Sequence, residues 1–166
     1  SFEAPLKALG FEIKNVQAGV DARLKQVEPS KVSVDGVEFS ASPEEKREYD
    51  AAMELLRKSD FAGAALAYSA FLRRFPGSGY IPSALYWQGN ALYAARDYTA
   101  AIQAYRSMIA SSPTHPRVPE SLLAIANCQL ELKDAKAAKA TLEALVKAHP
   151  QSEAASAAKD RLSRMR

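Results

Sequence analysis

Cysteine, histidine and long apolar runs are scarce in this sequence, and each scarcity excludes a class of protein. The single cysteine, Cys128, cannot form a disulfide within the chain. It lies in the run IANCQL, where a small buried residue is more typical than a reactive thiol. The two histidines, His115 and His149, lie beside prolines in expected loops and do not make a metal site. No apolar run approaches the roughly 20 residues that a membrane-spanning helix needs.

Charge of one sign is not concentrated anywhere in the chain either. The net charge is +3, without the long run of like charges that marks an interaction tail. A basic groove with an aromatic platform for nucleic acid is not apparent. The sequence also lacks the common zinc-protease, nucleophile-elbow and phosphate-loop motifs, and Gly77-Ser78-Gly79 has no accompanying lysine. We therefore expect a protein that is not an enzyme, binds no nucleic acid and needs neither a metal nor another cofactor.

Six residues recur at one interval and show how the chain is organised. Three aspartates and three prolines, each set spaced by 37 residues, divide much of the chain into three similar units. A fixed period in the range of roughly 20–50 residues is the signature of a repeat array. In each unit one apolar run precedes the aspartate and another ends at the proline, which predicts helix, tight turn, helix and stop. The recurring residues are Asp60, Asp97, Asp134, Pro76, Pro113 and Pro150.

The second unit matches the tetratricopeptide repeat most clearly. Gly89, Ala101 and Tyr105 fall at the small and aromatic positions of that repeat, and Pro113 falls at its stop. The small residues let two helices approach, Tyr105 fills the seam, and proline cannot continue a helix because it lacks an N–H. The interval exceeds the usual period of about 34 residues. The extra residues fall in the proline-containing joints PGSGYIP and PTHPRVP.

These patterns predict an all-α fold, a tetratricopeptide-repeat solenoid of three helix pairs with a C-terminal capping helix over residues 152–165. The repeat domain comprises residues 43–166. It begins after Ser42, which is a good N-cap with Pro43 at the first helical position and Glu45 three residues after the cap. We expect at least seven helices after residue 42 and almost no strand outside residues 31–40.

Residues 1–29 form a separate segment with a narrow apolar stripe. The stripe follows a heptad pattern with one stutter, which predicts the end of a coiled coil that continues upstream of this sequence. Gly10 and Gly19 weaken it as an isolated helix. A helix that packs back on the repeats is the alternative. The residues expected to mediate oligomerisation are Leu6, Leu9, Ile13, Val16 and Val20.

Residues 30–42 link this segment to the repeats. Valines and a phenylalanine flank the pair Asp35-Gly36, which favours a two-residue hairpin turn. An isolated hairpin is marginally stable in water. We therefore expect a short extended or hairpin-like arm.

The candidate site is the concave face, which the first helix of each unit is expected to line. The floor is apolar and aromatic, and two equivalent asparagines can pair with backbone amides of a ligand, which suits an extended peptide or an amphipathic helix. The alternative for each residue is packing between neighbouring repeats alone. Trp87, one step off this face, is expected in the core. The predicted groove residues are Tyr49, Met53, Leu56, Tyr86, Asn90, Tyr93, Leu123, Asn127 and Leu130.

The stretches YWQGNALYAARDY and IANCQLELKD resemble the C-terminal domain of the CpoB family, also called YbgF, of the Tol-Pal system. The resemblance covers residues 43–163. The heptads, the arm VSVDGVEF and the Ser-Pro-Glu-Glu start are also similar to the coiled-coil end and linker of that family. Two residues depart from the pattern, since Ala135 replaces the usual aromatic residue and Gln129 replaces an apolar one.

The resemblance implies a periplasmic protein of a Gram-negative bacterium with a cleaved leader, and the start at Ser1 fits either a removed leader or a fragment. It implies that the protein binds TolA, forms a homotrimer through its full coiled coil, and does not insert into the membrane. It also implies contact with the peptidoglycan synthase machinery, so that outer-membrane constriction is coordinated with septal peptidoglycan synthesis during cell division. Another class of function stays open, namely a structural oligomeric scaffold or an enzyme-regulating adaptor in a different cell-envelope assembly.

Overall fold

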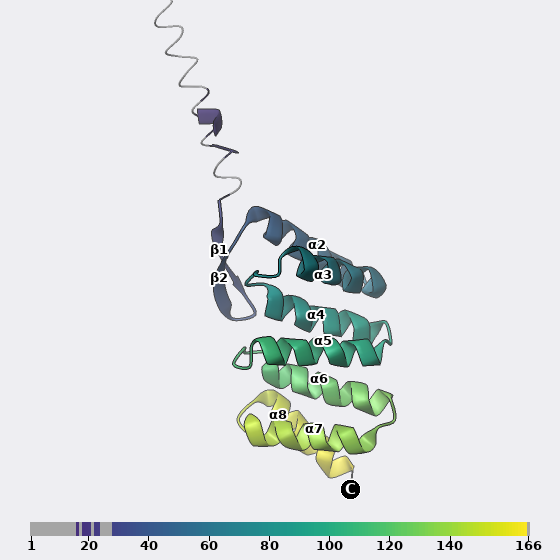
Figure 1. The fold of residues 1–166 in the computed structure, drawn as a ribbon. Coiled ribbons are helices and arrows are strands. Elements are labelled where there is room, and N and C mark those ends of the chain that lie inside the picture. The colour runs from purple at the N-terminus through teal and green to yellow at the C-terminus, as the bar shows by residue number, and fades with distance from the viewer. Residues whose placement is uncertain (1–15, 17, 21, 24–27, 166) are drawn as a thin grey trace, which may run out of the picture.

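The repeat region of the chain is a stack of antiparallel helices (Figure 1). The structure, a computed structural model, describes residues 16, 18–20, 22–23 and 28–165. Its elements are β1 (Ser30–Val34), β2 (Val37–Ala41), α2 (Pro43–Arg57), α3 (Phe61–Arg74), α4 (Ile81–Ala94), α5 (Tyr98–Ser111), α6 (Val118–Glu131), α7 (Ala135–Ala148) and α8 (Glu153–Arg164). Seven helices in the described part after residue 42 confirm the predicted all-α solenoid, with three pairs and α8 as the cap.

The recurring aspartates are the N-caps of the second helix of each pair. Their side chains accept backbone N–H bonds from Gly63, Ala100 and Ala137, at 3.0, 3.2 and 3.1 Å. The residue before each aspartate has a positive φ, near 63–65°, which reverses the chain within two residues. Backbone N–H groups of this left-handed turn donate to carbonyls at the end of the first helix, and the aspartate side chain accepts an N–H at the start of the next. The polar backbone groups at both helix termini therefore have hydrogen-bond partners. The residues with positive φ are Ser59, Arg96 and Lys133.

The small residues that repeat along the chain lie where paired helices approach most closely. A Cβ added to Gly89 of α4 would lie 2.5 Å from Cε1 of Tyr105 on α5, and that tyrosine is fully buried. The equivalent pairs of the other repeats, Ala52 with Ala64 and Ala126 with Ala138, have no exposed surface. Side-chain volume at these positions therefore determines how far the two helices of a repeat lie apart.

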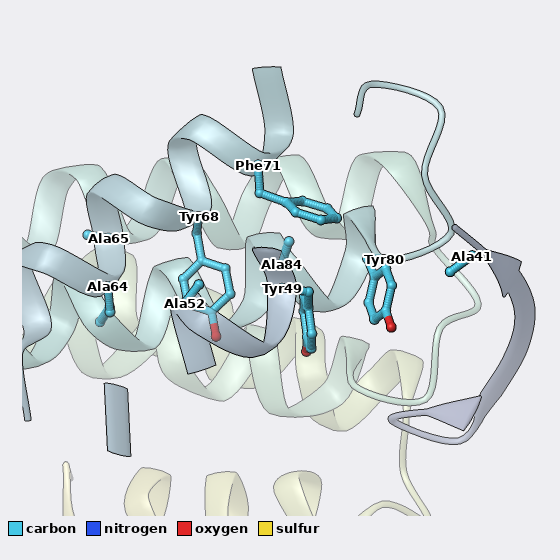
Figure 2. Close-up of a cluster of buried hydrophobic side chains, with 10 residues drawn as sticks. Ala41, Tyr49, Ala52, Ala64, Ala65, Tyr68, Phe71, Tyr80 and Ala84 are labelled. Carbon is cyan, nitrogen blue, oxygen red and sulfur yellow. The ribbon is translucent and has the colours of Figure 1, made fainter. Parts of the chain in front are cut away.

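The core is divided into three clusters, and each cluster joins one helix pair to the helix that follows it. The first cluster is aromatic, and Figure 2 shows its rings between α2, α3 and α4. Tyr49 stacks on Tyr80 with ring centroids 4.3 Å apart, and Phe71 meets Tyr80 edge-on at 5.8 Å. The third cluster includes Ala155 and Ala158 of the capping helix, as predicted. Because α4 belongs to the first and second clusters and α6 to the second and third, neighbouring repeats share their cores.

Strands β1 and β2 form the predicted hairpin, with Asp35 and Gly36 at positive φ in its turn. Its pairs Val32 with Phe39 and Val34 with Val37 place these side chains on one face. That face packs on the first cluster, where the ring of Phe39 meets Tyr80 edge-on at 4.8 Å. The hairpin is therefore not a free arm, because its apolar face is covered by the solenoid.

Most of the predicted heptad stripe lies outside the described residues. Leu6, Leu9 and Ile13 are among those that the structure does not describe. Val16 and Val20 are helical and are 66% and 47% exposed. The coiled coil therefore stays a prediction. Within the residues that the structure describes, none of the helices combines the length and apolarity needed to cross a membrane.

The contact between Gly89 and Tyr105 yields the first prediction. Gly89→Ala should lower the free energy of unfolding by about 1–3 kcal/mol, because the new methyl group overlaps a buried ring. Gly77→Ala is the matched control, since a Cβ at Gly77 meets no atom within 4 Å, and its effect should stay within about 0.5 kcal/mol. Urea denaturation of both variants measures the difference. Equal stabilities would show that the close approach does not constrain the helix pair.

Candidate protein-binding groove

The first helices of the repeats lie on the inner face of the solenoid. Within the described chain α2 packs against α4 and α6 packs against α8, whereas α3 and α5, or α5 and α7, have no comparable contact. A stack that is tighter on one side curves toward that side. The inner face is therefore formed by α2, α4, α6 and α8, and the predicted groove residues come from the first three of these helices.

The structure separates the predicted groove residues into two groups. Tyr49 and Tyr86 are core residues, with only 4% and 8% of their surface exposed. The others are half-buried and leave part of their side chains open to a ligand: Met53, Leu56, Asn90, Tyr93, Leu123, Asn127 and Leu130. The half-buried residues are apolar, aromatic or amide side chains, so this part of the inner face carries no charge of its own.

Tyr49 is fixed by the first core cluster rather than aimed at a ligand. Burial raises the pKa of its hydroxyl well above the usual range, so it stays protonated. The hydroxyl has no hydrogen-bond partner among the described residues. Its ring packs against Tyr68 and Tyr80. Tyr49 therefore positions α2, and its neighbours Met53 and Leu56 present the accessible surface of that helix.

The two equivalent asparagines retain hydrogen-bonding capacity. Asn90 Oδ1 accepts a hydrogen bond from the Tyr105 hydroxyl, which orients the amide. The side chain of Asn127 bonds to no other described residue, whereas the Asn90 amide also lies within hydrogen-bonding reach of the Tyr86 hydroxyl. Each amide can donate to a backbone carbonyl of a bound segment. Because the asparagines lie one repeat apart, they can hold successive parts of one ligand.

A hollow of about 490 Å³ lies at the C-terminal end of the inner face, between the starts of α6 and α8. Leu123, from the predicted set, lies in it, together with Pro116, Pro119 and Ala157. The carboxylates of Glu120 and Glu153 also line the hollow, which makes its border acidic. An apolar hollow with carboxylates at its edge favours a segment that combines apolar and basic residues.

Arg117 joins the hairpin to the start of α6 through contacts that the sequence analysis did not predict. It donates to Asp35 at the hairpin turn, with Nη2 and Nε at 2.7 and 2.9 Å from Oδ1. Its Nη1 donates to Glu120 Oε2 at 2.7 Å. The guanidinium lies 5.0 and 5.3 Å from the ring centroids of Tyr86 and Trp87. We call the pair Asp35 and Arg117 the clasp.

The clasp is ionised and largely removed from water. The Asp35 side chain is 8% exposed and that of Arg117 is 28% exposed. Burial opposes ionisation of Asp35, but hydrogen bonds from Ser83, Arg117 and Trp87 and the charge of Arg117 outweigh it and hold its pKa below the usual range. The Trp87 indole N–H donates to Asp35 at 3.3 Å. Trp87 therefore packs where predicted, but it also supports the clasp.

His115 shapes the joint before α6 in its neutral form. Its Nδ1 accepts the backbone N–H of Arg117 at 3.0 Å, which requires an unprotonated ring nitrogen. Burial lowers the pKa of His115, the negative charge of Asp35 opposes this, and the positive charge of Arg117 adds a smaller lowering effect. The histidine is thus a loop residue, as expected, and it also orients the backbone that carries Arg117.

Comparisons with known proteins agree with this architecture. Two models of the tetratricopeptide repeat match residues 49–116 and 92–162. The Cell division coordinator CpoB of Pseudomonas putida is 45% identical over 53 residues. That match covers 32% of this chain and only 20% of the relative, so the chain matches about a fifth of the length of that protein.

Solved structures share the fold at low sequence identity. PcrH in complex with the chaperone binding region of PopB has a TM-score of 0.60 at 16% identity, covering 80% of this chain and 100% of that one. The Arabidopsis OM64 tetratricopeptide-repeat domain has a TM-score of 0.60 at 14% identity, covering 74% and 96%. Yersinia enterocolitica SycD in complex with a YopD peptide has a TM-score of 0.60 at 17% identity, covering 75% and 91%.

The clasp yields the second prediction. In a double-mutant cycle, Asp35→Asn and Arg117→Met should show a coupling of about 1–3 kcal/mol, because each variant leaves a partly buried group without its partner. The exposed pair Lys46 and Asp50, at 2.8 Å, is the matched control. Its coupling should stay below about 0.5 kcal/mol. Denaturation at neutral pH measures both cycles, and similar couplings would contradict a special role for the clasp.

Proposed function

Because this chain is a tetratricopeptide-repeat protein, we propose that it is a non-enzymatic module that binds a segment of another protein along its inner face. The observation that supports this most directly is the row of half-buried apolar residues with two half-buried amides, Asn90 and Asn127, of which Asn127 bonds to no other described residue. Apolar side chains supply contact area, and the amides fix the backbone of the ligand. The clasp and the first core cluster hold the helices that carry this surface.

The similarity to CpoB supplies the biological setting of the proposal. We place the protein in the periplasm of a Gram-negative bacterium, in the Tol-Pal system, with TolA as its partner. In that role it coordinates outer-membrane constriction with septal peptidoglycan synthesis, in contact with the peptidoglycan synthase machinery. The acidic hollow between α6 and α8 would receive a basic part of the bound segment.

Titration with TolA tests the inner face. The double variant Asn127→Ala/Leu130→Ala should weaken TolA binding at least about tenfold, because it removes one free amide and one apolar contact. Both side chains are half-buried, so the fold should remain intact by circular dichroism.

The matched control truncates one amide and one leucine on the second helices. Gln103 and Leu66 are both exposed there, and Gln103→Ala/Leu66→Ala should bind TolA like the unmodified protein. A reversed ranking of the two double variants would move the site off the inner face. Absence of TolA binding by the unmodified chain would favour the scaffold or adaptor function in another envelope assembly.

We also propose that the full protein forms a homotrimer through the N-terminal heptads. The exposure of Val16 and Val20 supports this, because an apolar stripe on a helix needs a partner. This chain, which has few heptads, should associate weakly and in a concentration-dependent way. Sedimentation equilibrium should show that deletion of residues 1–29 abolishes the association. Undiminished association of the shortened chain would place the contact in the repeats instead.

A further inference from the structure

The outer face of the solenoid carries an apolar hollow that the inner groove does not use. It has a volume of about 440 Å³ and lies between α5 and α7, with α6 beneath. Leu122 and Ile125 of α6 form its floor, and Ile109, Ala140 and Ala144 form its sides. Because α6 packs against both α5 and α7, the floor is fixed by the second and third repeats together.

The hollow results from particular residues and not from the solenoid geometry alone. The equivalent seam between α3 and α5 carries polar side chains 37 residues earlier: Gln103 for Ala140, Ser107 for Ala144 and Gln88 for Ile125. In that seam the Gln88 amide donates to Ser69 at 2.6 Å, so polar groups satisfy one another across the surface. The seam between α5 and α7 lacks these groups, and Leu122 at its floor stays partly exposed while Ile125 is buried.

The charge around this hollow is positive. Arg106 is the one charged residue in its lining, and it forms no ion pair with any described residue. On α7, Lys136 and Lys147 lie about one helical turn from Ala140 and Ala144, and Glu143 lies one turn from Ala140, so this side of the helix carries two cations and one carboxylate. On the inner face, α4 carries no charged residue and α6 carries two carboxylates, Glu120 and Glu131.

We propose that the seam between α5 and α7 is a second protein-binding site, which takes an acidic amphipathic helix of a partner. Apolar side chains one turn apart on that helix enter between Ile109 and Ala144, and flanking carboxylates pair with Arg106 and the two lysines. A lipid surface is a poorer match. A peripheral protein inserts protruding apolar side chains into a membrane, whereas here the apolar residues line a recess. The site leaves the inner groove free, so two partners can bind at once.

A synthetic peptide tests the site without knowledge of the partner. The probe is a fluorescein-labelled helix of about 18 residues, roughly 27 Å long, built from Leu, Ala and Glu with all leucines on one face. It should bind at least about tenfold more tightly than an isomer of the same composition whose leucines are dispersed around the helix. Equal affinity for the two peptides would reduce the interaction to unspecific charge attraction and overturn the proposal.

Two variants and their matched controls locate the peptide. Ala144→Gln fills the hollow and Arg106→Glu reverses its charge, and each should weaken binding at least about fivefold. The same changes at the other seam, Ser107→Gln and Arg73→Glu, should leave the affinity unchanged. All four positions are exposed, so the fold should tolerate them.

Two further outcomes would overturn the proposal. If Asn127→Ala/Leu130→Ala abolished peptide binding, the peptide would lie in the inner groove. If vesicles of phosphatidylcholine and phosphatidylglycerol bound the protein while the peptide did not, the surface would be a lipid contact. A failure of TolA to bind the inner face would leave these results unaffected, because no arm of the experiment uses TolA.

Discussion

The close approach of paired helices is the constraint on which the rest of the structure depends. Gly89 leaves room for the ring of Tyr105 between the two helices of the second repeat. The aspartate turn then fixes where the second helix begins. With spacing and start fixed in every unit, α2 packs against α4 and α6 packs against α8 on one side of the stack, while the second helices make no comparable contact on the other. The inner groove and the outer hollow both follow from this asymmetry.

The hairpin lies outside the repeat array but is held in a fixed position on it. Its apolar face covers the first core cluster, and its turn reaches the third repeat through Arg117. The guanidinium is held on two aromatic rings from α4, so the clasp joins the hairpin to the second and third repeats. A charged pair that is this poorly hydrated favours one position of the hairpin, because any other position would leave Asp35 or Arg117 unpaired.

Much of the fold could be predicted from the sequence because the residues that a helix pair needs for its turn and its end recur in every repeat. Asp97 and Pro113 were informative because each has equivalents one period away. The capping box of Ser42 and Glu45 is a local pattern, and it forms as expected. In contrast, the clasp joins residues 82 positions apart, and Asp35 has no counterpart in the array. The Asp35-Gly36 pair predicted the turn but not the surface on which the turn lies.

The groove prediction had a different limit, because helical position shows which face a residue occupies but not how deep it lies. Tyr49 and Tyr86 occupy the expected face, yet neighbouring helices cover them. Burial of a large ring depends on the volumes of its neighbours, such as Tyr68 and Tyr80, which come from other elements. The outer hollow was missed for the same reason, since Ala140 and Ala144 look like ordinary helix residues until α6 is placed beneath them.

The hairpin also has a mechanical consequence. Its open end is the pair Ser30 and Ala41, and the chain continues from Ala41 into α2. Tension applied between residues before Ser30 and the solenoid therefore separates the strands one pair at a time, starting from that end. The clasp lies at the turn and is the last part to yield. Complete opening would release about 12 residues, which span roughly 40 Å when extended, while every helix of the array stays folded.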